Sequence, residues 1–414
     1  MFMRWHVLSV LTIVVACAAG HSTSPSPLAK PEDSPAPVQP ERNPQPEASP
    51  GPAASPSPTA SEEPESPAPP APEQPRHCPE GMVFVEGEYC TDVDQKCLQS
   101  WYDESNKKTV CEVFDVPTHC VGARVHKRFC IDEFSWPNVR GERPEVMNRF
   151  HQAQVKCASA GKRLCTESEW TFACEGPEAK PFPYGYVRDP RKCNGDQLWD
   201  GPDMDKVAAR DPKELARLWK GVRSGSQPQC VSDFGVADLP ANNDEIVASE
   251  TFTAGWRGKY DSVHTGGPWY RGVRNQCRPK IYTHDEGFYY YFLGFRCCAE
   301  PDGQQTDPRT PKQRKGDWSF KHVERIAGFT REEVRTLLKL KGERGNCGCN
   351  DKKGHQARIR CDTICGTLLG PDAQDAKQPP AEGLPPFGAK KRATPEQIQR
   401  SFEAGQRRAP ESEN

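Results

Sequence analysis

Nineteen cysteines in a chain of 414 residues constrain this protein more than any other feature of its sequence. Such a count indicates either metal ligands or export to an oxidising compartment, because a reducing cytosol keeps thiols from pairing. Cys17 lies at the end of an apolar leader, and without it eighteen cysteines are left. An even number in an exported chain is typical of a disulfide framework.

The first residues have the pattern of an export signal. Arg4 and His6 precede an apolar run over residues 7–15, which is too short to span a bilayer but suits the core of a signal peptide. The Ala16-Cys17 step resembles a bacterial lipobox, in which Cys17 becomes the lipidated first residue of the mature chain. Ala16-Cys17-Ala18 also fits ordinary cleavage, which would give a secreted protein.

We therefore expect residues 1–17 to be a signal peptide with a lipobox, and the mature chain to be exported. The residue after Cys17 is Ala18 and not Asp, which by resemblance to Gram-negative lipoproteins favours the outer membrane, on its periplasmic or cell-surface side. The lipid anchor makes the membrane one expected partner.

Residues 18–76 are predicted to form a disordered, Pro-rich linker. The stretch 21–76 holds 18 of the 42 prolines and no aromatic residue, so it has nothing with which to build a core. Such a composition favours an extended polyproline II chain. We expect it to hold the following domain away from the membrane.

Charge and hydropathy exclude two further classes. The 55 basic and 57 acidic side chains give a formal charge of −2, which argues against a dedicated nucleic-acid binder. No apolar run reaches the roughly 18 residues of a membrane-spanning helix. The remaining expected partner is an unidentified protein, peptide or glycan.

Residues 77–300 are predicted to form an irregular, disulfide-rich α+β domain. The run Val83-Phe84-Val85 predicts a strand. Apolar residues at helical spacing predict a helix over 145–160, and residues 168–174 predict a second one. Short apolar runs split by Gly, Pro and Asp indicate loops over much of the rest.

Residues 315–370 are predicted to form a small helical module. Thr330 and Glu333 form the pattern of a capping box, and an apolar stripe follows at Val334, Leu337, Leu338 and Leu340. Its cysteines suit either two disulfides or a zinc site, of which an oxidising compartment favours disulfides: Cys347, Cys349, Cys361 and Cys365. The polar residues 371–414 are predicted to be a disordered tail.

Seven phrases of the compact region, taken in order, resemble motifs of the formylglycine-generating enzyme, or sulfatase-modifying factor, family. The most specific is Gly161-Lys-Arg-Leu-Cys-Thr-Glu-Ser-Glu-Trp170, which is close to G-K-R-L-P-T-E-A-E-W. The others are Pro79-Glu-Gly-Met-Val-Phe-Val-Glu-Gly87, Phe129-Cys-Ile-Asp-Glu-Phe-Ser-Trp-Pro-Asn138, Pro183-Tyr-Gly185, Gly235-Val-Ala-Asp-Leu-Pro-Ala-Asn-Asn-Asp-Glu-Ile246, Gly266-Gly-Pro-Trp269 and Gly294-Phe-Arg296. The resemblance covers about 220 of the 414 residues and implies a C-type-lectin-like fold.

The resemblance also implies two disulfides, Cys157 with Cys297 and Cys174 with Cys277. In the family, a Cys before G-K-R-L pairs with the Cys after G-F-R, and a Cys after the E-W helix pairs with one that precedes G-F-R. The partners of the other ten cysteines of the domain stay open at this stage.

Catalysis in the family requires two thiols that bind copper(I), two and seven residues after G-G-S-W. The matching positions are Arg271 and Gln276, and neither side chain binds this soft ion. Copper is therefore not expected, and no catalytic residue is assigned. The leading hypothesis is a non-catalytic binding or scaffold module of the cell envelope. The alternatives are an oxidase that converts a sulfatase cysteine to formylglycine, and a structural subunit of an envelope complex that docks through residues 315–370.

Calcium is a possible ligand by the same resemblance. The first implied site combines the carboxylates of Asp238 and Glu245 with the carbonyls of Ala241 and Asn243. A second implied site uses Asn194. Carboxylate, amide and carbonyl oxygens are the ligands that calcium prefers.

A binding surface is expected where the family builds its substrate cleft. Arg271, Arg274 and Arg278 lie in this part of the chain and suit the recognition of carboxylate or sulfate groups. Tyr290 belongs to the aromatic run Phe288-Tyr-Tyr-Tyr-Phe292, which predicts either a stacking wall for a ligand or core packing.

Overall fold

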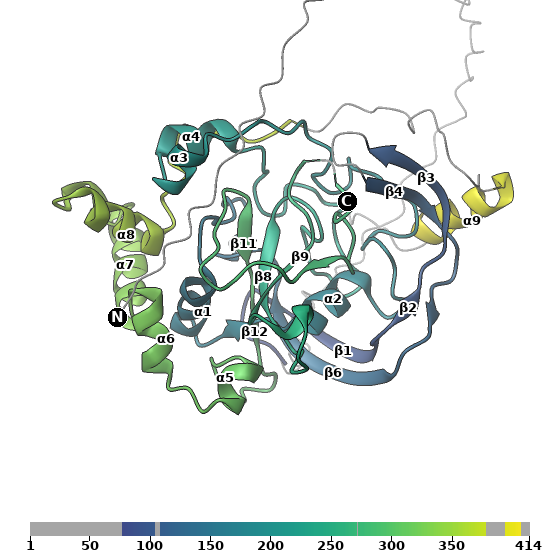
Figure 1. Ribbon diagram of the computed structural model, residues 1–414, viewed down its shortest axis with the longest axis horizontal. Coiled ribbons are helices and arrows are strands. Elements are labelled where there is room, and N and C mark those ends of the chain that lie inside the picture. The colour runs from purple at the N-terminus through teal and green to yellow at the C-terminus, as the bar shows by residue number, and fades with distance from the viewer. Residues whose placement is uncertain (1–76, 104–107, 271, 378–393, 407–414) are drawn as a thin grey trace, which may run out of the picture. The chain divides into compact units, whose positions relative to one another are not determined.

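The computed structural model describes residues 77–103, 108–270, 272–377 and 394–406 (Figure 1). The predictions for the signal peptide, Cys17 and the linker lie outside these residues. Within the described part, no helix has both the length and the apolar character that a membrane span requires.

One four-stranded sheet has the order β1-β6-β12-β7. β1 (Met82–Cys90) pairs antiparallel with β6 (Arg124–Asp132) over its whole length, and β12 (Cys297–Ala299) joins β6 to β7 (Arg163–Leu164). The predicted strand at residues 83–85 is therefore confirmed within β1. Pairing with β6 fixes its register, with Val85 opposite Phe129 in the core.

The second four-stranded sheet has the order β10-β9-β8-β11. β8 (Asp244–Ala248) lies parallel to β11 (Leu293–Phe295) and antiparallel to β9 (Ser262–Thr265), which pairs with β10 (Lys280–Ile281). Every residue of β8, β9 and β11 is buried. This sheet therefore presents its polar side chains to the interior of the domain, where each requires a partner.

Two sheets of two antiparallel strands complete the strands: β2 (Val93–Asp94) pairs with β5 (His119–Cys120), and β3 (Cys97–Asp103) pairs with β4 (Lys108–Phe114). The sequence did not predict them. Disulfide Cys90–Cys120 links β1 to β5, and Cys97–Cys111 links β3 to β4.

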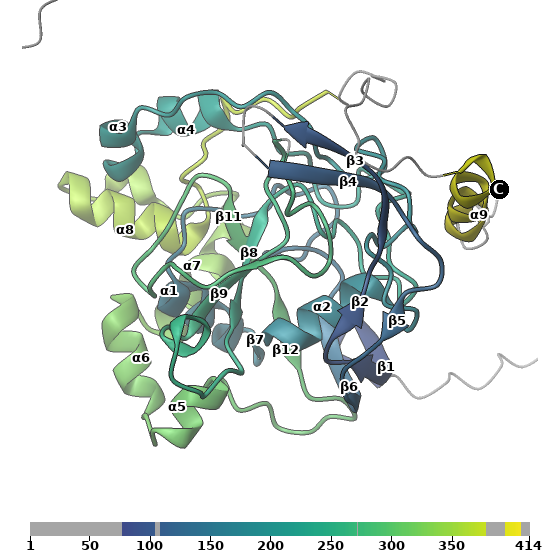
Figure 2. The ribbon, with the colours of Figure 1, turned by 45° about the vertical axis from the view of Figure 1, so that its right-hand side comes forward.

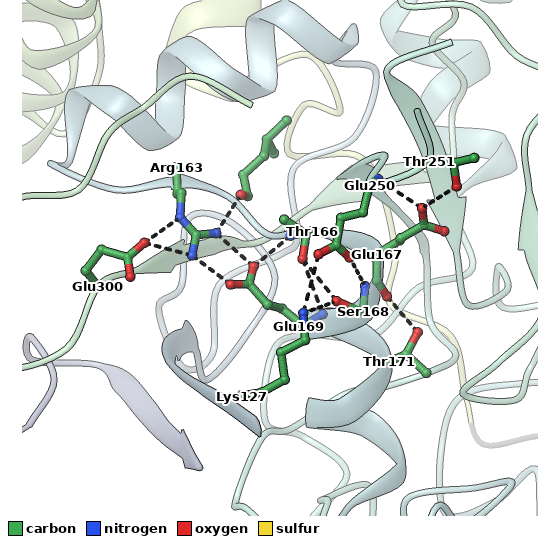
Figure 3. A network of polar contacts seen from close by, with 11 residues as sticks. Lys127, Arg163, Thr166, Glu167, Ser168, Glu169, Thr171, Glu250, Thr251 and Glu300 are labelled. Atoms are coloured by element: carbon green, nitrogen blue, oxygen red, sulfur yellow. Dashed lines mark hydrogen bonds and ion pairs between the residues drawn. The ribbon is translucent and has the colours of Figure 1, made fainter. Parts of the chain in front are cut away.

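The most specific motif of the resemblance folds into a structural unit. α2 (Glu167–Glu175) confirms the predicted second helix, and it begins with a capping box between Thr166 and Glu169. Figure 3 shows Glu169 also accepting two hydrogen bonds from Arg163, at 2.7 and 2.8 Å, while Arg163 reaches Glu300 as well. Burial raises the pKa of Glu169, but Arg163 outweighs this and lowers it to about 2.

The other predicted helix begins later than expected. α1 spans Phe150–Ser159, whereas the apolar spacing predicted residues 145–160. The reason is that the preceding residues form contacts with other segments: the backbone N–H of Glu145 donates to Trp136, and that of Met147 donates to Tyr290. Met147 also has a positive φ of 67°, which cannot continue a helix.

Both disulfides implied by the resemblance are present, Cys157–Cys297 and Cys174–Cys277. They join residues 140 and 103 positions apart, and loop entropy alone makes each worth about 4–5 kcal/mol. The sequence left the remaining pairs of this domain open. Besides Cys90–Cys120 and Cys97–Cys111, they are Cys78–Cys130, Cys165–Cys298 and Cys193–Cys230.

The C-terminal helices share a core with the preceding domain. They are α5 (Pro311–Lys315), α6 (Phe320–Ala327), α7 (Arg331–Arg344) and α8 (His355–Cys365), with a short 3-10 turn η2 (Cys349–Asp351). Val155 of α1 is buried among Val323, Val334 and Ile364. Thr330 caps α7 as expected. The cysteines form two disulfides, Cys347–Cys365 and Cys349–Cys361, so these thiols are not zinc ligands here.

The segment after α8 differs from the predicted disordered tail. Leu368 and Ala373 pack into a cluster with Trp219 and Trp269, and Asp375 forms ion pairs with Arg143 and Arg223 at 2.9 and 2.7 Å. Residues 395–406 form helix α9 (Pro395–Gln406), which begins with a capping pair between Thr394 and Gln397. The polar composition concealed this start signal.

Two further short helices were also missed. α3 (Met204–Ala208) and α4 (Pro212–Leu218) are capped by Asp203 and Asp211, and a 3-10 turn η1 lies at Trp256–Gly258. Figures 1 and 2 both show α3 and α4 beside α8. Their apolar residues Val207, Leu215 and Leu218 pack into the same cluster as Trp219 and Trp269.

One buried ion pair connects these layers. Arg296, which lies between β11 and β12, donates to Glu245 of β8 at 2.7 Å and is 0% exposed. Arg296 also donates to the carbonyls of Asp132, Glu133 and Ala237. Glu245 accepts further hydrogen bonds from Ser135 and from the Trp170 indole. All charges and donors of the pair are thus satisfied, as a buried pair requires.

We expect Glu245→Gln to lower the free energy of unfolding by about 3–5 kcal/mol, because Arg296 would remain buried without a counter-charge. Urea unfolding of the protein with its disulfides intact measures this. The control is Glu300→Gln, which removes a more exposed partner of Arg163 and should change stability by less than about 1 kcal/mol. Equal effects of the two substitutions would contradict the assignment.

Candidate functional site

The cleft segment begins at two glycines that no other residue could replace without rearrangement. Gly266 has a φ of 70°, and a Cβ there would lie 2.4 Å from the Pro240 carbonyl oxygen. A Cβ on Gly267 would lie 1.9 Å from Oδ1 of Asn275. This close packing places the following Trp269 in the interior, where it is 2% exposed.

Arg274 and Arg278 each have a buried carboxylate partner. Arg274 donates to Asp244 of β8 at 2.8 Å and to the Gly266 carbonyl at 3.0 Å. Arg278 makes two bonds of 2.6 Å to Glu175 of α2. Burial raises the pKa of Asp244 to about 6 and that of Glu175 to about 7, against the opposing effect of each arginine.

Two arginines of the predicted binding surface are therefore in ion pairs with buried carboxylates, and the surface itself stays a prediction. Arg274 and Arg278 hold different elements in place, and their charges are balanced locally. Arg271 lies outside the described residues. A ligand could still contact the exposed parts of these side chains, but it would not meet a cluster of unpaired arginines there.

The aromatic run is mostly core. Tyr291 and Phe292 are 3% and 8% exposed and pack on Trp269. Tyr290 is half-buried, stacks near Phe288 with ring centres 5.8 Å apart, and its hydroxyl lies 3.5 Å from the sulfur of Met204. Within the run, Phe288, Tyr289 and Tyr290 are partly exposed, so these are the side chains within reach of a ligand.

His264 of β9 is a buried group that the sequence did not single out. It is 2% exposed, and its Nε2 has no hydrogen-bond partner in the described structure. The ring lies 5.1 Å from that of His284 and 5.4 Å from that of Phe288. Burial, aided by the nearby His284 and Arg274, lowers the pKa of His264 to about 3. A lone His in a short strand gives no signal of this environment.

The position of the family's second thiol is occupied by Gln276, whose backbone N–H donates to the Arg274 carbonyl at 2.7 Å. The neighbouring Cys277 is 0% exposed and bonded to Cys174. In the described ranges every cysteine belongs to one of nine disulfides. This part of the chain therefore has no pair of thiolates that could bind copper(I).

The two carboxylates of the first implied calcium site differ in their protein partners. The carboxylate of Glu245 is occupied by Arg296, Trp170 and Ser135, so it does not fit a cation in this arrangement. Asp238 has one oxygen bonded to the Gly225 N–H and one without a partner. No group of three or more metal-binding side chains is found in the ranges that the structure describes.

Two of the remaining implied ligands, the Ala241 carbonyl and the Asn194 side chain, have protein partners. The backbone N–H of Asn243 donates to the Ala241 carbonyl at 3.0 Å. The side chain of Asn194 donates to Asn242 at 3.0 Å and accepts from Gln197 at 3.1 Å. Calcium binding stays a prediction, and it would require Glu245 to exchange its present partners for the ion.

These features define a disulfide-linked α+β domain whose described residues lack the pair of free thiols that the enzymes of the resembled family use. The family model described as "Sulfatase-modifying factor enzyme 1-like domain" matches residues 70–301, and the chain belongs to this family.

The proteins similar to the chain include one curated relative and three solved structures. It is 34% identical over 110 residues to "Inactive C-alpha-formylglycine-generating enzyme 2" of Bos taurus, which is 26% of this chain and 34% of that protein. The chain thus matches about a third of that relative's length.

The structures share 14–15% identity with the chain. PvdO from Pseudomonas aeruginosa covers 52% of this chain and 93% of its own with a TM-score of 0.31. CarF covers 54% and 98% with a TM-score of 0.33. Treponema denticola variable protein 1 covers 52% and 99% with a TM-score of 0.30.

We expect His264 to make the fold sensitive to acid. Its pKa is lower in the folded chain than its ordinary value of 6.5, so the unfolded state binds the proton more readily. The stability that His264 permits is present above pH 6.5 and is lost as the pH falls towards 3. At pH 4.5 the loss amounts to about 2–3 kcal/mol.

The variant His264→Phe keeps the aromatic contacts and removes the titration. Between pH 7 and pH 4.5 it should lose about 2–3 kcal/mol less stability than the parent, measured by urea unfolding. The exposed His119→Gln is the control and should behave as the parent does. An identical acid response of His264→Phe and the parent would contradict the buried, neutral histidine.

Proposed function

We propose that this domain is a non-catalytic binding or scaffold module of the cell envelope. The observation that supports this most directly is that the family's copper-binding positions carry no free thiol. Arg271 and Gln276 occupy the family's copper-binding positions, and Cys277, the nearest cysteine, is bonded to Cys174. A fold that stabilises its cleft with cystine bonds gains rigidity there but gives up the reduced sulfurs that the oxidation requires.

The name of the bovine relative describes that protein as inactive, which agrees with the proposal but does not extend to this chain by itself. The covalent and ionic links around the cleft support a scaffold more directly. Arg274, Arg278 and Arg296 each join two segments of the chain through an ion pair with a carboxylate.

The proposal places the module outside the cytoplasm. Nine disulfides within the described residues are consistent with an oxidising compartment. A lipid anchor at Cys17 and a Pro-rich linker would then hold it at a membrane surface. Mass spectrometry of the N-terminal peptide, with acylation at Cys17 as the expected result and an unmodified Cys17 as the contrary one, tests the anchor.

The second candidate, a structural subunit that docks through residues 315–370, is less favoured. α6, α7 and α8 bury their apolar residues against α1 of the same chain. The surface that a docking module would offer to a partner is therefore already used within the domain.

We expect the purified protein to leave a C-x-P-x-R peptide unchanged in the presence of copper(I) and oxygen. Mass spectrometry of the peptide measures the conversion of cysteine to formylglycine. A catalytically active member of the family, run in parallel, is the positive control, and a peptide with Ser in place of Cys is the negative one. Formation of formylglycine by this protein would overturn the proposal and favour the oxidase alternative.

A further inference from the structure

Arg210 is a buried cation without a carboxylate partner. Three arginines are buried in the described part of the chain, Arg188, Arg210 and Arg296. Arg188 pairs with Glu112 and Asp196, and Arg296 pairs with Glu245. Arg210 is 7% exposed, and its guanidinium donates to Oγ1 of Thr363 at 3.0 Å and forms a side-chain hydrogen bond with Tyr289, so both of these partners are uncharged. A buried charge without a counter-charge is costly, so this arrangement needs an explanation.

The backbone at Arg210 is itself unfavourable. The residue lies between α3 and α4 with a φ of 56°, a left-handed conformation that glycine or asparagine adopts more readily. Its neighbour Asp211 caps α4 by accepting from the backbone N–H of Glu214, and no ion pair between Asp211 and Arg210 is found among the described residues. The chain thus places a guanidinium inward at a position where a smaller residue would be more stable.

A second guanidinium faces the same tyrosine. The Cζ atoms of Arg210 and Arg149 lie 4.4 and 5.0 Å from the centre of the Tyr289 ring. Arg149 is exposed, and no ion pair to a carboxylate is found for it in the described structure. It is also the N-cap residue of α1, at the positive end of a ten-residue helix, where a cation is disfavoured.

The electrostatic consequences are visible on two groups. Burial, with a smaller contribution from the charge of Arg149, lowers the pKa of Arg210 to about 10 against the opposing effect of Tyr289. Lys156 lies nearby with its charge balanced by Glu145, and Arg210 and Lys341 are among the groups that lower its pKa. Two guanidinium groups and a helix N-terminus therefore create a positive field that no carboxylate of their own neutralises.

Tyr289 gives this pair access to open space. Its ring also lines a surface cavity of about 320 Å³, together with His284, Asp285 and Phe288. Asp285 is the one carboxylate among the lining residues, and it is exposed. A small anionic group that enters this cavity meets Tyr289, the side chain that both guanidinium groups contact.

We propose that Arg149 and Arg210 bind an oxyanion at the edge of Tyr289: the carboxylate, sulfate or phosphate group of a ligand. Guanidinium groups suit such anions because their donors match two oxygens at once. The site uses α3, α4 and α1 and does not depend on the thiol positions. It therefore stands whether the domain is catalytic or not, and it supplies a ligand chemistry that the cleft arginines do not.

The test is a thermal-shift and calorimetric titration of the full chain with potassium sulfate, potassium phosphate and sodium acetate, against potassium chloride at equal ionic strength. At least one oxyanion should raise the melting temperature by several degrees above chloride. A response to acetate alone assigns a carboxylate ligand, and a response to sulfate or phosphate assigns a tetrahedral one. No oxyanion effect beyond that of chloride would overturn the proposal.

Three variants assign the effect to these residues. Arg210→Gln and Arg149→Gln should each weaken oxyanion binding at least about tenfold, the scale of one charge-assisted hydrogen bond. Arg217→Gln on α4 removes a charge that Glu214 already balances, and it should bind as the parent does. In chloride, Arg210→Gln should melt at a higher temperature than the parent, because it removes an unpaired buried charge.

The opposite pattern contradicts the site. An Arg210→Gln variant that is less stable in chloride yet keeps the oxyanion shift would show that Arg210 is structural and that the anion binds elsewhere. If Arg210→Gln does not fold, the exposed Arg149→Gln decides alone, and unchanged oxyanion affinity in that variant overturns the proposal.

Discussion

The bond between Glu245 and Arg296 holds the layers of this domain together. Glu245 belongs to the second sheet, while Arg296 lies at the step between the sheets and donates to the carbonyls of Asp132 and Glu133 at the end of the first. Trp170 brings α2 to the same carboxylate. Two charges withdrawn from water are stable only when all their hydrogen-bonding capacity is used, so the pair fixes the relative placement of strands and helix.

This constraint also bears on what the site can do. The carboxylate of Glu245 neutralises Arg296, and Arg274 and Arg278 neutralise Asp244 and Glu175, so a metal ion or an anionic ligand at these groups would have to compete with an ion pair. The disulfides act in the same direction on the sulfurs. Several groups that the family resemblance suggested for function thus hold the fold, whereas Oδ1 of Asp238 and Nε2 of His264 are buried without a hydrogen-bond partner in the described structure, and Arg210 is buried without a carboxylate partner.

Much of the fold could be predicted from the sequence because its signals are local. The motif of residues 161–170 specifies a capped helix and its ion pair within ten residues, and the cysteine count indicates a disulfide framework. The order of the remaining motifs then identified the family, and the family implied the disulfides Cys157–Cys297 and Cys174–Cys277. These inferences needed no knowledge of distant contacts.

The failures share the opposite property. The helix expected at residue 145 starts at Phe150 because Trp136 and Tyr290 bind the preceding backbone. Arg274 and Arg278 resembled a binding surface because their partners, Asp244 and Glu175, lie 30 and 103 residues away. Arg210 gave no signal at all, since its burial depends on α8 and Tyr289. Contacts between remote segments decide whether a charged side chain is structural or available.

The central claim is that the domain keeps the family's fold while its cysteines, including Cys277 next to the family's copper-binding positions, are held in disulfide bonds. Alkylation of the denatured, unreduced protein with iodoacetamide, followed by peptide mapping, tests it most directly. The account requires that no cysteine between residues 77 and 377 is alkylated and that Cys174 and Cys277 are recovered in one cross-linked peptide. Alkylated Cys174 and Cys277 would instead show free thiols next to the family's copper-binding positions, and the oxidase alternative would become the leading function.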